Sequence, residues 1–308
     1  MNCSVVIPVY KGEATLRPLV ERLGQVLPAL ADSYEVILVN DGSPDQSWER
    51  IVELGGQYPW VVGINLMRNY GQHNATLCGV RAARGEIIIT MDDDLQHPPE
   101  EIHLLIEKLH EGYDVVYGAP KRLPQGFFRN LMTKYIKLTL ALVMGTPSVR
   151  NISAFRALRA NLRSAFADFH SPDLTLDVLL SWGTARFTSV QVGIEEPRQR
   201  RSNYSFYALS KQALLILTGY STAPLRLASL TGFFMTLLGL AVFIYVLVIY
   251  STVGSLPGFP FLASIISLFG GAQLFTLGIF GEYLARVFHS SMDRPPYVVG
   301  EVLGGDKR

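Results

Sequence analysis

Short apolar runs alternate with longer amphipathic segments through the N-terminal part of the chain. The apolar runs are rich in Val and Ile and have the length of buried strands: Ser4–Tyr10, Glu35–Asn40, Val61–Asn65, Glu86–Met91 and Asp114–Gly118. The segments between them have the length of helices: Thr15–Leu30, Asp45–Leu54, Gln72–Ala83 and Pro99–Leu109. This alternation predicts an α/β fold with a mainly parallel sheet and helices on both of its faces.

A much longer apolar pattern follows toward the C-terminus. Between Arg226 and Glu282 lie 55 residues without a single Asp, Glu, Lys, Arg or His. Ser251–Pro260 divides them, because its Gly and Pro residues break a helix. The flanking segments, 227–250 and 261–280, are each long enough to cross a hydrocarbon core about 30 Å thick. We therefore predict a hairpin of two transmembrane helices. Two buried helices of a soluble protein are disfavoured, since neither segment has a polar face.

Charges beside the hairpin predict its orientation. Arg226 precedes the first predicted span, Arg286 and Arg294 follow the second, and the connecting turn carries no charge. By the positive-inside rule, both termini are expected on the cytoplasmic side of the inner membrane, with the turn outside. Ahead of the hairpin, Tyr204–Thr218 mixes apolar and polar side chains, which predicts an amphipathic helix on the bilayer surface or, alternatively, an ordinary packing helix.

These patterns predict four parts in the chain. They are an α/β domain (1–202), an interfacial helix (203–222), two transmembrane helices (223–281) and a cytoplasmic C-terminal tail (282–308). Composition adds two limits. The formal net charge of +1 gives no argument for nucleic-acid binding. Cys3 and Cys78 are the only cysteines, so the chain has neither a disulfide framework nor a cysteine-based metal site.

Polar clusters follow the first four predicted strands, at the point where each strand ends. They are PVYKGE, NDGSPD, RNYGQHN and DDDLQ, beginning at Pro8, Asn40, Arg68 and Asp92. Ligands of parallel α/β sheets bind beyond the carboxyl ends of the strands, so the clusters predict one binding cleft. The chain lacks the glycine fingerprint of a dinucleotide site and the glycine–lysine motif of a P-loop.

Three consecutive carboxylates, Asp92, Asp93 and Asp94, end the fourth predicted strand. Adjacent like charges repel, and their desolvation costs free energy unless a cation lies among them. Asp92, Asp94 and Gln96 offer hard oxygen ligands of the kind that Mg²⁺ or Mn²⁺ takes, usually together with substrate phosphates. A helix N-cap would explain one of these aspartates but not three. Asn40 and Asp41, after the second strand, offer hydrogen bonds to a nucleobase.

The segments SVVIPVYKGE, VILVNDGSPD, RNYGQHNAT and IITMDDDLQHPPEEI resemble the family 2 inverting glycosyltransferases of the GT-A fold. More narrowly, they are similar to the polyprenyl-phosphate glycosyltransferases, which include dolichyl-phosphate mannose synthases, undecaprenyl-phosphate glucosyltransferases and undecaprenyl-phosphate 4-deoxy-4-formamido-L-arabinose transferases. Gly281–Val299 resembles the tail of the last subgroup, so the resemblance covers nearly the whole chain. It implies transfer of a sugar from a nucleotide-sugar, with UDP expected, to undecaprenyl phosphate at the cytoplasmic membrane face, for envelope glycan modification.

The resemblance also implies roles for individual residues. Asp92, Asp94 and Gln96 match the family's metal site, and Asp94 is the main catalytic candidate. The matches to the donor-binding loops are Pro8, Tyr10, Glu13, Asn40, Asp41 and Gln72. Asp93 is expected either to support the metal ligands without touching the metal or to contact a sugar hydroxyl.

The chain departs from the family where a general base would be sought. Many relatives carry an Asp just ahead of a Phe–Arg pair, whereas 149–156 contains no carboxylate. A phosphate acceptor needs no strong base, because its second pKa of about 6 leaves it largely dianionic at pH 7. If a base exists, Asp177 is the candidate. The acceptor phosphate is expected to meet cationic side chains: Lys121, Arg122, Arg129, Arg198, Arg200 and Arg201. Contact of these side chains with anionic lipid head groups is the alternative.

Two other functions compete with this hypothesis. A processive polysaccharide synthase of the same fold would normally have more membrane helices and a Gln-x-x-Arg-Trp motif, neither of which is found. A non-catalytic membrane assembly subunit is disfavoured by the intact Asp-x-Asp pattern. Whether the chain forms a homo-oligomer stays open.

Overall fold

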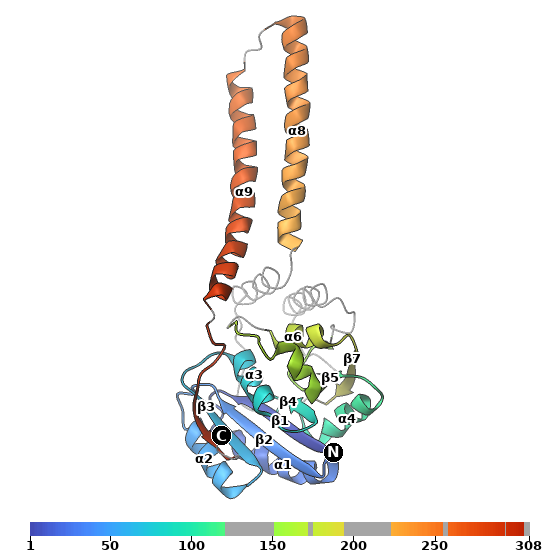
Figure 1. Ribbon diagram of the computed structural model, residues 1–308, viewed down its shortest axis with the longest axis vertical. Helices are drawn as coiled ribbons and strands as arrows, with labels where there is room; N and C mark the ends of the chain where they lie inside the picture. The colour runs from blue at the N-terminus through green and yellow to red at the C-terminus, as the bar shows by residue number, and fades with distance from the viewer. Residues whose placement is uncertain (121–150, 172–174, 194–222, 255–257, 293, 305–308) are drawn as a thin grey trace. The chain divides into compact units, whose positions relative to one another are not determined.

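The computed structural model describes residues 1–120, 151–171, 175–193, 223–254, 258–292 and 294–304 (Figure 1). The chain divides into two compact units. One consists of Met1–Ser210 together with Asp293–Arg308, and the other is Lys211–Met292.

The described part of the first unit contains an eight-stranded mixed sheet. Its strand order is β7-β5-β6-β4-β1-β2-β3-β8. The strands are β1 (Asn2–Val9), β2 (Ser33–Asn40), β3 (Val61–Leu66), β4 (Ile87–Thr90), β5 (Val115–Pro120), β6 (Arg156–Arg159), β7 (Phe187–Val192) and β8 (Val299–Leu303). The four central strands β4, β1, β2 and β3 are mutually parallel, whereas β6 and β8 run antiparallel to their neighbours. The predicted α/β fold with a mainly parallel sheet is confirmed.

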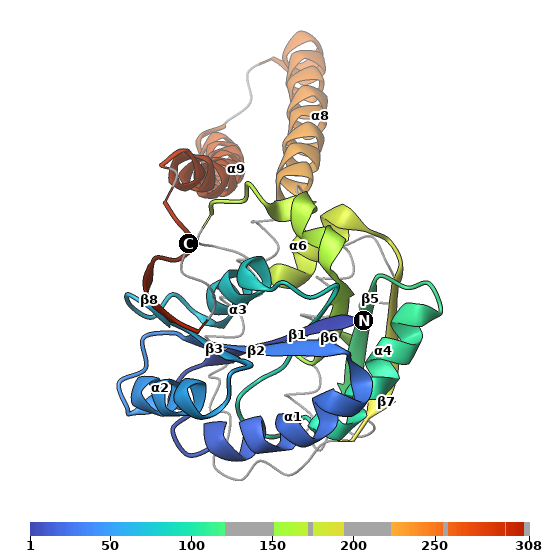
Figure 2. The ribbon, with the colours of Figure 1, turned by 60° about the horizontal axis from the view of Figure 1, so that its bottom comes forward.

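Helices cover both faces of this sheet (Figure 2). The helical elements are α1 (Leu16–Leu30), α2 (Ser47–Gln57), α3 (Gln72–Ala82), the 3₁₀ turn η1 (Pro99–Glu101), α4 (Ile102–His110), the 3₁₀ helix η3 (Ala160–Phe166) and α6 (Leu176–Gly183). In both ribbon views α1 and α2 lie on one face, and α3 and α6 lie on the other.

Side chains along β1 alternate between the two helical layers, as expected for a strand buried on both sides. Val5, Ile7 and Val9 belong to the core cluster formed with α1, α2 and α4. Val6 faces the opposite layer, where a Cβ atom added at Gly79 of α3 would lie 2.3 Å from Val6 Cγ1. The absence of a side chain at Gly79 therefore lets α3 pack directly on the strand that leads into the first polar loop.

The predicted strands and helices of residues 1–118 all form, with bounds close to those expected. The sequence patterns do not predict β6, β7, β8 or α6. In place of the predicted tail over 282–308, α9 (Phe259–Ser291) continues beyond the predicted span and β8 then pairs with β3. The C-terminal segment is thus part of the α/β unit, because its backbone completes the edge of the sheet.

The second unit contains two long helices, α8 (Ala223–Val253) and α9. They pack closely where Gly239 faces the ring of Phe269, since an added Cβ would lie 2.9 Å from its Cζ atom. Within the described residues, one segment, Leu225–Val246, is long and apolar enough to cross a membrane. The two-span hairpin stays a prediction, and the predicted interfacial helix (203–222) lies outside the described residues.

Candidate active site

The loops that follow β1, β2, β3 and β4 contact one another at the carboxyl ends of these strands. The backbone N–H of Lys11 donates to Ser43 Oγ at 3.1 Å, and that of Gly12 donates to Ser47 Oγ at 2.9 Å. The N–H of Tyr10 donates to Asp93 Oδ2 at 3.3 Å. The first polar loop is therefore tied both to the loop after β2 and to the acidic loop after β4.

Asp41 lies at the centre of this arrangement, and it is buried. Its two carboxylate oxygens accept hydrogen bonds from the N–H groups of Tyr70, at 2.7 Å, and Gly71, at 2.9 Å. Burial raises the pKa of Asp41, and these two bonds oppose the rise. Asp41 thus holds the loop after β3 in place, while each oxygen keeps a further lone pair for a ligand.

The backbones of these two loops come unusually close. Gly42 has a φ of 60°, and a Cβ atom there would lie 2.5 Å from the backbone of Arg68 and Asn69. Glycine is therefore required at position 42 both for the left-handed conformation and for the contact. Where the ends of β2 and β3 pair, the buried Asn40 donates from Nδ2 to Asn65 Oδ1 at 2.8 Å.

Each outer carboxylate of the acidic loop accepts hydrogen bonds from a glutamine amide. Gln72, the first residue of α3, donates from Nε2 to Asp92 Oδ1 at 2.6 Å. Gln96 donates to Asp94 from its backbone N–H, at 3.1 Å, and from Nε2, at 2.6 Å. The middle carboxylate, Asp93, turns to the first loop instead. A Cβ atom on Gly12 would lie 2.4 Å from Asp93 Oδ2, so the contact depends on the missing side chain.

Charge in the acidic loop is only partly compensated by the protein. Burial, followed by the charges of Asp94 and Asp93, raises the pKa of Asp92 to about 7, while Arg156 and the amide of Gln72 oppose the rise. The side chain of Asp92 nevertheless keeps part of its surface accessible, so a ligand can reach it. A site with this excess of negative charge favours a cation.

Arg156 is a functional candidate that the sequence analysis did not assign. It is buried on β6, opposite Thr90 at the end of β4, and its Nε donates to Thr90 Oγ1 at 3.1 Å. Its guanidinium forms an ion pair with the buried Asp177. Tyr117 donates from its hydroxyl to Asp177 at 2.8 Å. Asp177 therefore lies in a buried cluster with an arginine and a tyrosine. The sequence does carry a signal for this cluster, because a single charged residue lies within each of the apolar runs 155–158 and 176–180.

His73, next to Gln72 on α3, lies within reach of the charges of this cluster. Burial lowers the pKa of His73, Asp177 opposes the shift and Arg156 adds to it. The imidazole is therefore held neutral at pH 7, with one ring nitrogen able to donate and the other able to accept a hydrogen bond.

Among the residues that the structure describes, two that are not glycine adopt left-handed backbone conformations, and both belong to these loops. Lys11 has a φ of 58° and Leu95 a φ of 62°. Such conformations cost free energy and are often retained where loop geometry serves a ligand. They lie in the loops that follow β1 and β4, which Asp93 joins.

The structure describes some of the remaining predicted site residues, and the others lie outside the part of the chain that it describes. Pro8 is buried within β1, Tyr10 is 39% exposed, and Glu13 is half-buried in the loop before α1. The predicted acceptor residues, Lys121, Arg122, Arg129, Arg198, Arg200 and Arg201, lie outside the described residues.

A metal at the acidic loop would have few protein ligands. Within the described residues there is no group of three or more His, Cys, Asp or Glu side chains that could hold a metal ion. Asp92 and Asp94 are two carboxylates, and Gln96 adds an amide oxygen. This ligand set suits Mg²⁺ or Mn²⁺ when the bound substrate supplies phosphate oxygens as well.

Comparison with known proteins shows the family to which the chain belongs. Residues 4–166 match the family model "Glycosyl transferase family 2". The chain is 35% identical to undecaprenyl-phosphate 4-deoxy-4-formamido-L-arabinose transferase of Proteus mirabilis, over 99% of this chain and 94% of the relative. It is 36% identical to the protein of the same name from Shewanella sediminis, over 98% and 93% of the two chains.

Solved structures show the same fold. Glucosyl-3-phosphoglycerate synthase from Mycobacterium tuberculosis, in complex with Mn²⁺ and UDP-glucose, aligns with a TM-score of 0.53 over 71% of this chain and 78% of its own, at 20% identity. The fold is the GT-A fold, as the sequence resemblance implied. The full-length relatives, the family model and the loops described above lead to one conclusion: the chain belongs to glycosyl transferase family 2 and is a glycosyltransferase.

Proposed function

We propose that this glycosyltransferase moves a sugar, with inversion, from a UDP-linked donor to undecaprenyl phosphate at the cytoplasmic face of the inner membrane. The observation that carries the proposal is the extent of the similarity. Relatives named for undecaprenyl phosphate match 98 to 99% of the chain, including the apolar helices that a soluble transferase would not need. By the same names, the transferred sugar is of the 4-deoxy-4-formamido-L-arabinose type. The product would serve modification of lipid A, O-antigen or another envelope glycan.

The nucleotide of the donor binds at the ends of β1 and β2. Asp41 and Asn40 recognise the base, and the first loop, with Pro8, Tyr10 and Glu13, lies against the nucleoside. The contacts of Asp41 with the loop after β3 support this role, because they fix the direction of its carboxylate.

A divalent metal, Mg²⁺ or Mn²⁺, would be held by Asp92 and Asp94 with Gln96. When bound, it neutralises charge on the leaving nucleoside diphosphate. The amide of Gln72 orients Asp92, and that of Gln96 orients Asp94, so the two carboxylates keep a fixed geometry toward the ligand. The Mn²⁺ in the solved relative is consistent with this choice of cation.

The acceptor phosphate binds to the basic segments that contain Lys121, Arg122, Arg129, Arg198 and Arg201. A dianionic phosphate oxygen attacks the sugar without prior loss of a proton, so positioning and electrostatic stabilisation carry the rate. Asp177 is not needed as a base, and its ion pair with Arg156 gives it another role.

The first prediction concerns the metal and the reaction together. Asp94→Asn removes one charged ligand at constant size, so transfer to undecaprenyl phosphate should fall by roughly a hundredfold or more while the protein stays folded. The product would be followed by mass spectrometry, with Mn²⁺ and a panel of UDP-sugars. Asp32→Asn, the same change at an exposed residue outside the site, is the matched control. Near-normal turnover of Asp94→Asn would exclude the metal assignment.

The second prediction concerns the pH dependence of metal binding. Because the pKa of Asp92 is raised to about 7, the carboxyl group of Asp92 is mostly protonated below that pH in the folded, metal-free protein. Metal binding requires the ionised carboxylate, so the affinity for Mn²⁺ should fall by up to about tenfold per pH unit below pH 7 and level off above it. Calorimetry in two buffers of different ionisation enthalpy would count the released proton. An affinity that is constant from pH 5.5 to 7.5 would contradict the expectation.

The third prediction separates a structural role of Asp177 from a catalytic one. Asp177→Asn leaves the buried Arg156 without its counter-charge, which should lower the free energy of unfolding by about 3–5 kcal/mol. The transfer rate of the folded fraction should fall by less than about tenfold. Glu100→Gln, which breaks the exposed ion pair with Arg22, is the control and should cost less than about 1 kcal/mol. A variant as stable as wild type but without transfer activity would identify Asp177 as a base and favour a hydroxyl acceptor.

The fourth prediction tests the membrane topology. Cysteine introduced at Ser255 should react with a membrane-impermeant thiol reagent added from outside, whereas cysteine at Asp306 should react only after the cytoplasmic side is opened. The native Cys3 and Cys78 are buried, so they should add little background labelling. Labelling of both positions from the same side would exclude the two-span hairpin.

A further inference from the structure

The C-terminal segment Tyr297–Leu303, here called the C-terminal strap, forms one edge of the sheet beside the candidate donor site. Within it, β8 pairs antiparallel with β3, placing Glu301 opposite Asn65 and Val299 opposite Leu66. The register of the pairing shifts between Asn65 and Leu66, where β3 ends and the next loop begins. The strap therefore contacts β3 up to its last residue.

The strap also reaches into the loop after β3. The N–H of Met67, the first residue beyond β3, donates to the carbonyl oxygen of Val298 at 3.0 Å. A Cβ atom on Gly300 would lie 2.9 Å from Met67 Sδ, so the strap and Met67 are in close contact there. Two residues further on, the loop rests on Gly42, and Tyr70 and Gly71 then donate to Asp41.

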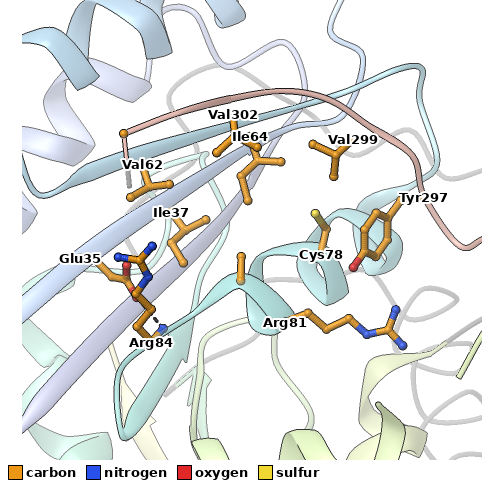
Figure 3. Close-up of a pocket in the computed structure, with 12 residues that line it drawn as sticks. Glu35, Ile37, Val62, Ile64, Cys78, Arg81, Arg84, Tyr297, Val299 and Val302 are labelled. Atoms are coloured by element: carbon orange, nitrogen blue, oxygen red, sulfur yellow. Dashed lines mark hydrogen bonds between the residues drawn. The ribbon is translucent and has the colours of Figure 1, made fainter. Parts of the chain in front are cut away.

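The other end of the strap is attached to α3. The side chains of Tyr297 and Cys78 line the same cavity beside α3 (Figure 3), and the guanidinium of Arg81 lies 5.9 Å from the centre of the Tyr297 ring. Arg81 in turn donates to the carbonyl oxygens of Phe166, Ala167 and Phe169. The strap thus begins at a fixed point on the helix whose first residue, Gln72, donates to Asp92.

Apart from these attachments, the side chains of the strap are poorly packed. A cavity of 340 Å³ separates it from α3, with Ile37, Val62 and Ile64 among the residues that line the sheet side (Figure 3). Most β8 side chains are exposed, including Val302 at 57%. The strap therefore adds little to the hydrophobic core, and its main contacts are backbone hydrogen bonds to β3 and to Met67.

We propose that the C-terminal strap is a positioning element that holds the 67–71 loop on Asp41 and thereby sets the affinity for the donor nucleotide. Loss of the strap frees Met67, and the loop can then leave the two oxygens of Asp41. The buried carboxylate would lose the donors that fix its direction. The proposal rests on the assigned role of Asp41 in binding the donor base.

The test introduces proline into β8, in the full chain. Consecutive strand residues direct their N–H groups to opposite sides, so one of Glu301 and Val302 donates toward β3. Glu301→Pro and Val302→Pro are therefore made separately, together with a chain that ends at Pro296. Gln191→Pro is the matched control, because β7 is the edge strand at the opposite end of the same sheet.

Three measurements distinguish positioning from general destabilisation. UDP affinity in the presence of Mn²⁺ should weaken about tenfold in the shortened chain and in at least one proline variant, and should stay within twofold of wild type in Gln191→Pro. In assays of transfer, KM for the donor should rise while kcat and KM for the acceptor are kept. Amide hydrogen exchange of residues 67–71 should accelerate, whereas α1 and α2 keep their protection.

Two results would overturn the proposal. One is unchanged UDP affinity together with unchanged exchange in residues 67–71 when the strap is removed. The other is loss of protection throughout the sheet, which would make the strap a part of the core. If wild type does not bind UDP but the 67–71 loop still loses protection in the strap variants, the donor assignment fails while the strap's hold on the loop is supported.

Discussion

The carboxylates that follow β2 and β4, the two strands on either side of β1, set the main constraint on this protein. An ionised carboxylate removed from water must regain hydrogen bonds or opposite charge. Asp41 regains them from two backbone N–H groups of the next loop. The acidic loop has glutamine amides for Asp92 and Asp94, a backbone N–H for Asp93 and the charge of Arg156. Asp41 is a single carboxylate with a backbone donor on each oxygen, whereas the acidic loop holds three adjacent carboxylates, so a cation is favoured at the acidic loop rather than at Asp41.

This constraint explains why the loops are so closely joined. Asp41, Asp92 and Asp93 each accept hydrogen bonds from a segment that follows a different strand, so satisfying these charges also fixes the loops relative to one another. Asp94 accepts its hydrogen bonds from Gln96 within its own loop. Glycine at positions 12 and 42 makes these contacts possible, since a side chain at either position would collide with the neighbouring loop. A donor with a diphosphate would therefore meet a preorganised set of groups.

The sequence predicted the elements whose patterns are local and repeated. β1 to β5 are apolar runs of ordinary strand length, and α1 to α4 have helical spacing, so both follow from periodicity. β6 begins and ends with an arginine, so it lacks the apolar pattern of a buried strand. The hydrogen-bond partners of these arginines are distant in sequence: Asp177 for Arg156, and the carbonyl oxygen of Leu109 for Arg159. β8 is short, contains Gly300 and follows a long apolar helix. Its pairing with β3 joins residues more than 230 positions apart, which no local pattern encodes.

The same distinction applies to the candidate site. Asp41, Asp92 and Asp94 could be chosen from sequence because they follow strands and match a family pattern. The cluster of Arg156, Asp177 and Tyr117 could not be chosen in this way, since it joins β6, α6 and β5 through buried side chains. Its position matters for the chemistry. The carboxylate of Asp177 is already held by the guanidinium of Arg156 and the hydroxyl of Tyr117, which gives it a structural role in the buried cluster. An acceptor that arrives already ionised fits a site built in this way.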